Sequence, residues 1–224
     1  MLPHLQNLVL LLPVHQSVHT NQMHITPNRY FIINKPYNMV SQFIGTEKAD
    51  LLGALNFDFP EGIHAVGRLD SHSEGLLILT TNKRVTKLLF QGKPHRRTYL
   101  VRVKNKVTEA QLETLQTGVS IRIKGGEYYH TPPSDVILLD TPPRVFEHQL
   151  ELRDFVPHSW LQISVYEGKY HQIRKMVSAI NHPCKRLIRI SIEDLELGNL
   201  EPGKVREFEE EEFFRLLKID DWKQ

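Results

Sequence analysis

Cysteine is nearly absent from this sequence of 224 residues, which holds only Cys184. A single cysteine cannot form an internal disulfide, and it cannot supply the cysteine pairs of a structural zinc site. This usage is typical of a protein that works in a reducing compartment, so we predict a cytoplasmic protein. We expect it to need neither a metal ion nor a cofactor.

A hydrophobic run long enough to cross a membrane is also absent from the N-terminus. The apolar stretch Leu8–Leu12 is far shorter than a bilayer span requires. No Lys or Arg precedes it, so it lacks the charged start of a secretory signal. We therefore expect no membrane association. We predict that residues 1–28 form a tail without fixed structure and that residues 29–224 form one domain.

Acidic residues are missing from two stretches that are rich in Lys and Arg. Residues 83–106 and 169–189 contain no Asp or Glu, although the formal net charge of the whole chain is only +2. A cluster of glutamates near the C-terminus conceals this imbalance in the total charge. Two basic stretches suit a polyanion such as nucleic acid, and a pair of solvated charged faces is the alternative.

The spacing of apolar residues predicts alternating strands and helices. Thr108 and Gln111 stand three residues apart as a capping box, and Gly118 closes the helix that they begin. We expect strands at 30–33, 76–81, 97–103, 160–165 and 187–192, and helices at 83–90, 108–118, 171–180 and 209–217. Two Pro-Pro pairs within residues 131–143 predict an irregular excursion. Short connections favour a mixed α+β domain over a doubly wound parallel sheet.

The segment HAVGRLDSHSEGLLILTTN, residues His64–Asn82, places polar residues directly before a buried strand. In an extended GRLD segment, Arg68 and Asp70 project to the same side, where the guanidinium would aim the carboxylate. A surface ion pair that caps a turn fits the same spacing. Ser73 lies in SHSEG rather than in a nucleophile elbow, which argues against a serine hydrolase. The glycine-rich KGGEYY at Lys124–Tyr129 lacks the rest of a phosphate-binding loop and supports nucleotide binding only weakly.

Six segments, taken together and in order, resemble the motifs of the pseudouridine synthases that modify ribosomal RNA, the RsuA/RluB/RluE/RluF family. The central and third motifs of that family are specific when they occur together. The matching segments are FIINKPYNMV (31–40), AVGRLDSHSEGLLILTTN (65–82), RRTYLVRV (96–103), YEGKYHQIRKM (166–176), CKRLIRI (184–190) and LGNLEPGKVREF (197–208).

The resemblance implies a role for each matching position. Asp70 would be the catalytic carboxylate and nucleophile, Tyr99 would stack on the target base, and Arg174 would pair with Asp70. Gly67 and Gly75 would let RNA approach the backbone. The implied substrate-binding residues are Lys35, Arg68, Lys175, Leu187 and Ile188. The family's fold implies a mixed, mainly antiparallel central sheet flanked by helices, in a monomer that uses no cofactor.

Two residues and the length of the N-terminus depart from the family's usual pattern. Asn38 and Ser191 stand where relatives often have glycine. Fewer than 30 residues precede the first motif, too few for the S4 RNA-binding domain that many relatives carry. The resemblance is therefore greatest to the RluE type, which implies a uridine of 23S ribosomal RNA as the target.

Three alternatives remain at this stage. The chain could modify another RNA, such as 16S ribosomal RNA or tRNA. It could be a non-catalytic RNA-binding protein of ribosome assembly. A glycosidase acting on a small nucleoside would need a second carboxylate, for which Glu74 is the nearest candidate.

Overall fold

The computed structural model describes residues 27–45, 49–141, 143–147 and 155–223. The predicted tail at 1–28 therefore lies almost wholly outside the described residues. The helices are α1 (Arg84–Gln91), α2 (Glu109–Thr117), α3 (Gln172–Ala179) and α4 (Glu210–Leu216), with a 3₁₀ turn, η1, at Leu52–Ala54. The strands are β1 (Tyr30–Lys35), β2 (His64–Val66), β3 (Glu74–Thr80), β4 (Arg97–Lys104), β5 (Ser120–Arg122), β6 (Tyr128–His130), β7 (Asp135–Leu139), β8 (His158–Val165), β9 (Cys184–Ile192), β10 (Leu195–Glu196) and β11 (Val205–Phe208).

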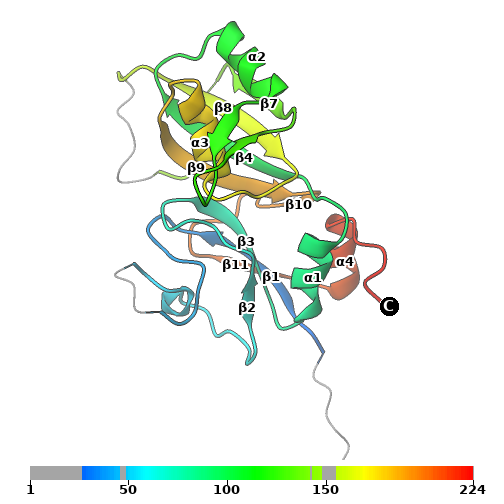
Figure 1. The fold of residues 1–224 in the computed structure, drawn as a ribbon. Helices are drawn as coiled ribbons and strands as arrows, with labels where there is room; N and C mark the ends of the chain where they lie inside the picture. The colour runs from blue at the N-terminus through cyan, green and yellow to red at the C-terminus, as the bar shows by residue number, and fades with distance from the viewer. Residues whose placement is uncertain (1–26, 46–48, 142, 148–154, 224) are drawn as a thin grey trace, which may run out of the picture.

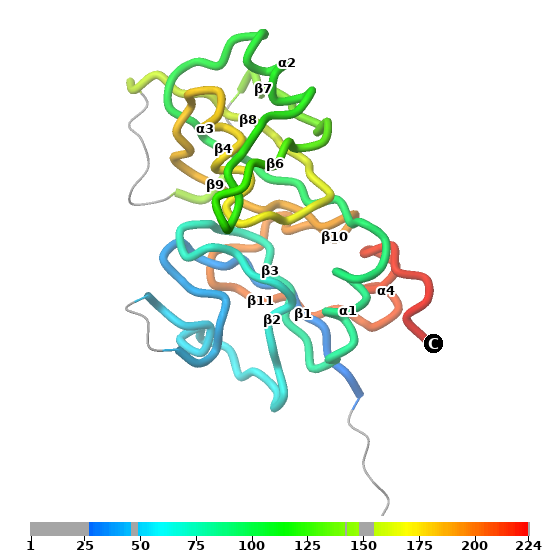
Figure 2. Tube along the Cα trace, viewed as in Figure 1, coloured from blue at the N-terminus to red at the C-terminus, as the bar shows by residue number. Residues whose placement is uncertain are grey.

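A central sheet with the strand order β11-β1-β3-β9-β4-β8-β7 organises the molecule. Within the described residues, every pairing in this sheet is antiparallel except that of β3 with β9, which is parallel over a short register. This confirms the predicted α+β class with a mixed, mainly antiparallel sheet. The chain runs from the half that contains β1 and β3 to the half that contains β4 and β8, and then returns (Figure 2).

Helices cover both halves of the sheet, with α1 and α4 beside one half and α2 and α3 beside the other (Figure 1). Side chains of β4 alternate between two buried clusters: Tyr99 and Val101 face one, and Leu100 faces the other. The apolar stripe of α3 packs into the first cluster through Ile173, Met176 and Val177. Because apolar layers lie on both faces, the strands are buried along almost their whole length.

The helix predictions are confirmed to within one or two residues at each end. Thr108 caps α2, its side chain accepts from the backbone of Gln111, and the Gln111 side chain bonds back to the Thr108 backbone. Asn38 adopts a left-handed backbone with φ of 59°, a conformation that asparagine tolerates better than most residues. Ser191 lies within β9, and the turn that follows is made at Glu193, which has φ of 50°.

The prediction of an irregular excursion at 131–143 is wrong in its central part. Asp135–Leu139 forms β7, which pairs antiparallel with β8 at the edge of the sheet. The prolines of the segment flank this strand rather than interrupt it, so they limit its length without removing a ladder hydrogen bond. Among the described residues, no helix is long and apolar enough to cross a bilayer.

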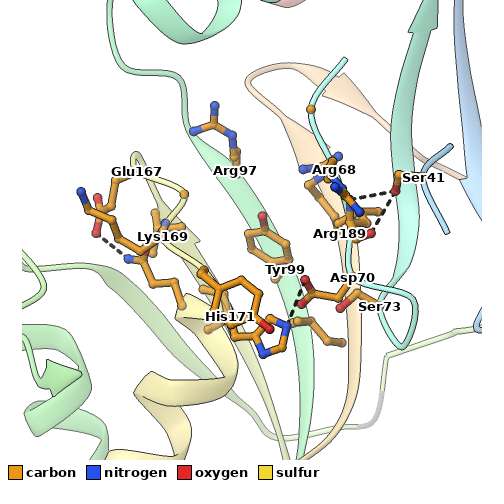
Figure 3. A pocket seen from close by; sticks show the side chains of 18 of the residues that line it. Ser41, Arg68, Asp70, Ser73, Arg97, Tyr99, Glu167, Lys169, His171 and Arg189 are labelled. Atoms are coloured by element: carbon orange, nitrogen blue, oxygen red, sulfur yellow. Dashed lines mark hydrogen bonds and ion pairs between the residues drawn. The ribbon is translucent and has the colours of Figure 1, made fainter. Parts of the chain in front are cut away.

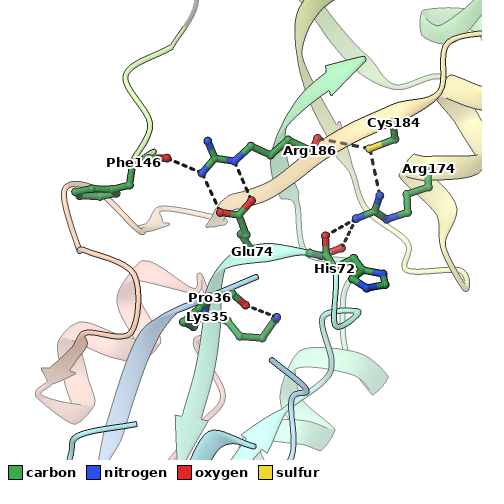
Figure 4. A network of polar contacts seen from close by, with 9 residues as sticks. Lys35, Pro36, His72, Glu74, Phe146, Arg174, Cys184 and Arg186 are labelled. Carbon is green, nitrogen blue, oxygen red and sulfur yellow. Dashed lines mark hydrogen bonds and ion pairs between the residues drawn. The ribbon is translucent and has the colours of Figure 1, made fainter. Parts of the chain in front are cut away.

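Several arginines of the two basic stretches lie inside the protein. Arg186 donates from Nε and Nη2 to the Glu74 carboxylate at 2.8 and 2.9 Å, and both side chains are buried (Figure 4). Arg97, Arg102 and Arg189 are buried as well. The stretches therefore present fewer surface cations than the composition predicted.

Candidate active site

A cavity of about 700 Å³ opens where the loop before β3 faces β4, β9 and the start of α3. Asp70 and Arg68 reach it from the loop, Tyr99 from β4, and Leu187 from β9 (Figure 3). Four segments that are far apart in the sequence therefore meet at one site. Four of the residues predicted for catalysis or substrate binding line it directly.

The loop that carries Asp70 is held by short-range bonds and close packing. Ser41 Oγ donates to the Leu69 carbonyl and accepts from the Leu69 amide, each at 2.9 Å. The amide of Ser73 donates to the Asp70 carbonyl at 2.9 Å and closes a turn. The Asp70 side chain itself is 34% exposed, so the carboxylate is fixed at its base and open to the cavity.

The two glycines that flank this loop are required by protein packing. A side chain at Gly67, which has φ of 73°, would meet the Phe90 ring at 2.7 Å. A side chain at Gly75 would collide with the backbone of Arg189, where β3 and β9 run in parallel. The structure thus assigns these glycines to close contacts within the protein rather than to an approach of RNA.

Asp70 has two cationic or polar partners on α3 and at its start. His171 Nε2 lies 3.3 Å from Asp70 Oδ1, and Arg174 Nε lies 4.0 Å from Asp70 Oδ2. The predicted meeting of Asp70 and Arg174 is thus found, as an ion pair at the outer limit of that contact. Arg174 Nη2 donates to the His72 carbonyl at 2.6 Å, so the guanidinium also holds the loop itself (Figure 4).

His171 is a site residue that the sequence analysis missed. It precedes α3 with a left-handed backbone, φ of 55°, which is rare outside glycine and asparagine. Its ring stacks on that of Tyr170 at 3.8 Å between centroids. The signal was available in YEGKYHQIRKM, where the histidine stands three positions before Arg174 and so reaches the same neighbour once the helix begins.

Tyr99 and Leu187 lie on the face of the sheet that borders the cavity, and both are largely buried. The prediction that Ile188 lines the same site is wrong. Successive strand residues point to opposite faces, and Ile188 packs in the cluster on the other side of the sheet. Arg189, the next residue on the cavity side, lines the site instead.

Lys35 was predicted to bind substrate, and the structure corrects this because the side chain is completely buried. Its Nζ donates to the carbonyls of Pro36 and Met39 at 2.8 and 2.6 Å, and to that of Ser71 at 3.3 Å. Burial lowers the pKa of Lys35 to about 7, against the opposing attraction of the nearby Glu74 and Asp70 carboxylates. Lys35 therefore supports the Asp70 loop from beneath.

Two further arginines line the cavity, and the sequence analysis had counted them only as part of the basic stretches. Arg97 Nη1 donates to the carbonyls of His95 and Tyr166, and Arg189 Nε donates to that of Leu76. Among the described residues, Arg189 Nη2 finds no hydrogen-bond partner. The site thus combines one reactive carboxylate, an aromatic wall and several cations, an arrangement suited to a base on an anionic strand.

Lys175, also predicted to contact substrate, does not line this cavity. Its Nζ lies 5.1 Å from the centre of the Tyr170 ring, on the side of α3 that borders a second cavity. The roles predicted for Asp70, Tyr99, Arg174 and Arg68 remain predictions that geometry alone does not test.

Comparison with known proteins gives consistent matches over this region. The sequence pattern of a family described as RNA pseudouridylate synthase matches residues 29–179. The ribosomal large subunit pseudouridine synthase E of Vibrio vulnificus is 36% identical over 186 residues, 82% of this chain and 76% of that protein. The protein of the same name from Xanthomonas axonopodis pv. citri is 33% identical over 174 residues, 76% of this chain and 89% of that protein.

A solved structure has a closely related fold. The crystal structure of a pseudouridylate synthase aligns with a TM-score of 0.69 at 26% identity, covering 86% of this chain and 75% of the other. The matched family region contains Asp70, Tyr99 and Arg174.

Proposed function

The chain belongs to the RNA pseudouridylate synthase family, and from this premise we propose that it converts one uridine of large-subunit ribosomal RNA into pseudouridine. The observation that carries the proposal is the placement of Asp70, a partly exposed carboxylate on a tightly held loop, beside Tyr99 in a cavity open to an extruded base. Enzymes that act on a base must take it out of the stack, and a cavity of this kind receives it.

In the proposed reaction the bond between uracil N1 and ribose C1′ breaks, and a bond between uracil C5 and C1′ forms. An Asp70 oxygen bonds to C1′ as uracil leaves, and the rotated uracil then displaces it through C5. The proton on C5 departs, with Tyr99 near enough to the base to assist, and N1 gains a proton. Atoms and electrons balance within the substrate, so the step needs no oxidant and no second substrate.

The cations around the cavity suit the charge of the RNA strand. Arg68 is exposed at the rim, and Arg97 and Arg189 line the wall. We assign Arg68 to the RNA near the extruded base, and Leu187 to the wall of the uracil pocket. Arg174 and His171 orient the carboxylate from α3.

The proposal of a large-subunit target rests on the relatives. The Vibrio and Xanthomonas proteins, both named as large-subunit enzymes, are similar to this chain over more than three quarters of its length. A glycosidase fits less well, because the Glu74 carboxylate accepts two hydrogen bonds from Arg186 and is buried away from the Asp70 cavity. A monomeric state and a cytoplasmic location stay predictions.

Mapping of pseudouridine in ribosomal RNA tests the proposal. RNA from cells that lack the gene should lose one modified position in the 23S molecule, and a plasmid with the wild-type gene should restore it. An unchanged map of 23S RNA, or a position lost from 16S RNA or tRNA, would contradict the large-subunit target.

A further inference from the structure

A second cavity, of about 470 Å³, lies between the β5–β6 hairpin and the start of α3. Its walls are formed by Arg122, Ile123, Lys124, Tyr170 and Lys175. This is where the glycine-rich KGGEYY segment folds, and the function proposed above makes no use of it. The volume falls within the range of pockets that hold small organic groups.

The hairpin is built to present its cations at one place. The Ile123 amide donates to the Glu127 carbonyl at 2.8 Å, and Gly125 and Gly126 take φ values of 93° and 90° in the turn between them. Lys169 Nζ lies 4.9 Å from the centre of the Tyr129 ring, which joins β6 to the segment before α3. The turn therefore stands beside Tyr170 rather than extending freely.

The lining combines an aromatic face with positive charge. Tyr170 is 62% exposed, and Lys175 Nζ lies 5.1 Å from the centre of its ring. No Asp or Glu occurs among the described residues that line this cavity. Exposed aromatic rings stack on nucleic-acid bases, and neighbouring Lys and Arg bind the phosphates that link them. The combination has the chemistry of a nucleotide site.

Tyr170 also lines the active-site cavity, so one side chain forms part of both walls. The next residue, His171, contacts Asp70. We propose that the second cavity binds a nucleotide that neighbours the target uridine in the RNA strand, with its base against Tyr170 and Ile123 and its phosphate near Lys124 and Lys175. The inference rests on the proposed function, because it takes the first cavity to hold the target uridine.

Binding of short RNAs to the full-length protein tests the base contact without any need for turnover. The probes are a single-stranded uridine decamer and a decamer of the same charge in which every base is missing. Tyr170→Leu should weaken binding of the uridine decamer about tenfold, as expected for a lost stacking contact, and change binding of the abasic decamer less than about twofold. Tyr170→Phe keeps the ring and should bind both probes like the wild type.

The matched control is Tyr128→Leu, because Tyr128 is 78% exposed on the same hairpin but lines neither cavity. It should bind both probes like the wild type. The inference is overturned if Tyr170→Leu weakens both probes equally or neither, or if Tyr128→Leu weakens the uridine decamer as much as Tyr170→Leu does.

The phosphate contact has an independent test, since Lys124 and Lys175 line only the second cavity. The double variant Lys124→Gln/Lys175→Gln should lower the slope of log affinity against log salt by about 1 to 2 for both probes. Lys204→Gln/Lys223→Gln removes the same charge from the other half of the molecule and should leave the slope unchanged. Equal slopes in the wild type and the Lys124/Lys175 variant would overturn the phosphate assignment.

Failure of the two proposals can be told apart. A protein that binds the probes as expected, yet makes no pseudouridine in ribosomal RNA, would contradict the proposed function and leave a nucleotide site beside Tyr170. A protein that makes pseudouridine, but whose Tyr170→Leu variant binds the uridine decamer as the wild type does, would contradict the second site alone.

Discussion

His171 Nε2 lies 3.3 Å from Asp70 Oδ1 and joins the start of α3 to the loop before β3. The histidine keeps this position with a left-handed backbone, a conformation that persists only where surrounding contacts hold it. Arg174, one turn further along α3, reaches the other carboxylate oxygen. Both oxygens of Asp70 therefore have a neighbour on the same short segment, which fixes the direction of the carboxylate.

His171→Gln should lower kcat for pseudouridine formation about tenfold, because a loosely held carboxylate spends less time in the reactive geometry. Affinity for RNA should change less than about threefold, since the contact is with Asp70. Steady-state kinetics and filter binding separate the two quantities. His64→Gln, on β2 and outside the cavity, is the matched control. A kcat equal to that of the wild type would exclude a positioning role for His171.

Arg174→Lys should also reduce kcat by roughly tenfold or more, since about one to two kcal/mol of orientation would be lost. Lysine keeps the charge but not the planar fork that here reaches Asp70, the His72 carbonyl and Ser73 Oγ together. Single-turnover rates measured with saturating enzyme isolate this effect from RNA binding. Full activity of Arg174→Lys would show that charge alone suffices.

The buried pair of Glu74 and Arg186 should matter for stability rather than for chemistry. Glu74→Gln leaves the Arg186 guanidinium without its carboxylate in a buried setting and should lower the free energy of unfolding by about 3 to 5 kcal/mol. Glu207→Gln breaks an exposed pair with Arg29 and should cost less than about 1 kcal/mol. Urea unfolding measures both, and similar losses for the two variants would contradict this assignment.

Lys35 should make stability depend on pH. Its pKa in the folded protein, about 7, lies below its ordinary value of 10.5. Between these values the unfolded chain binds more protons, so the free energy of unfolding rises as pH increases through this window. Lys35→Met removes the titrating group and should be less stable, because three carbonyls lose their donor.

Urea unfolding at about pH 7 and about pH 9 measures the Lys35 effect. The stability of the wild type should rise relative to that of Lys35→Met as pH increases, and groups common to both proteins cancel in the comparison. A difference that stays constant with pH would mean that the Lys35 pKa is not lowered on folding.

Local features of the fold could be predicted from the sequence, because they depend on neighbours a few residues apart. Thr108 and Gln111 cap α2 as their spacing indicates, and the apolar stripe of α3 packs into the core. The edge strand β7 was missed because its flanking prolines are strong local signals, whereas its pairing with β8 is a long-range contact.

The candidate site was predicted in part, and its errors have physical causes. The alternation of side chains along a strand separates Leu187 from Ile188, a signal that was present but not applied. The burial of Lys35 and the Asp70–His171 contact depend on segments about a hundred residues or less apart that only the folded sheet brings together. The cations of the basic stretches divide in the same way, with Arg186 inside and Lys169 exposed.

The central claim is that the Asp70 carboxylate is the reacting group, and Asp70→Asn tests it most directly. The amide keeps the shape of the side chain but cannot act as the nucleophile. Release of tritium from uridine labelled at C5 in large-subunit RNA reports each turnover. We expect release to be abolished in Asp70→Asn, with RNA affinity within a few-fold of the wild type. Release at a substantial fraction of the wild-type rate would contradict the account.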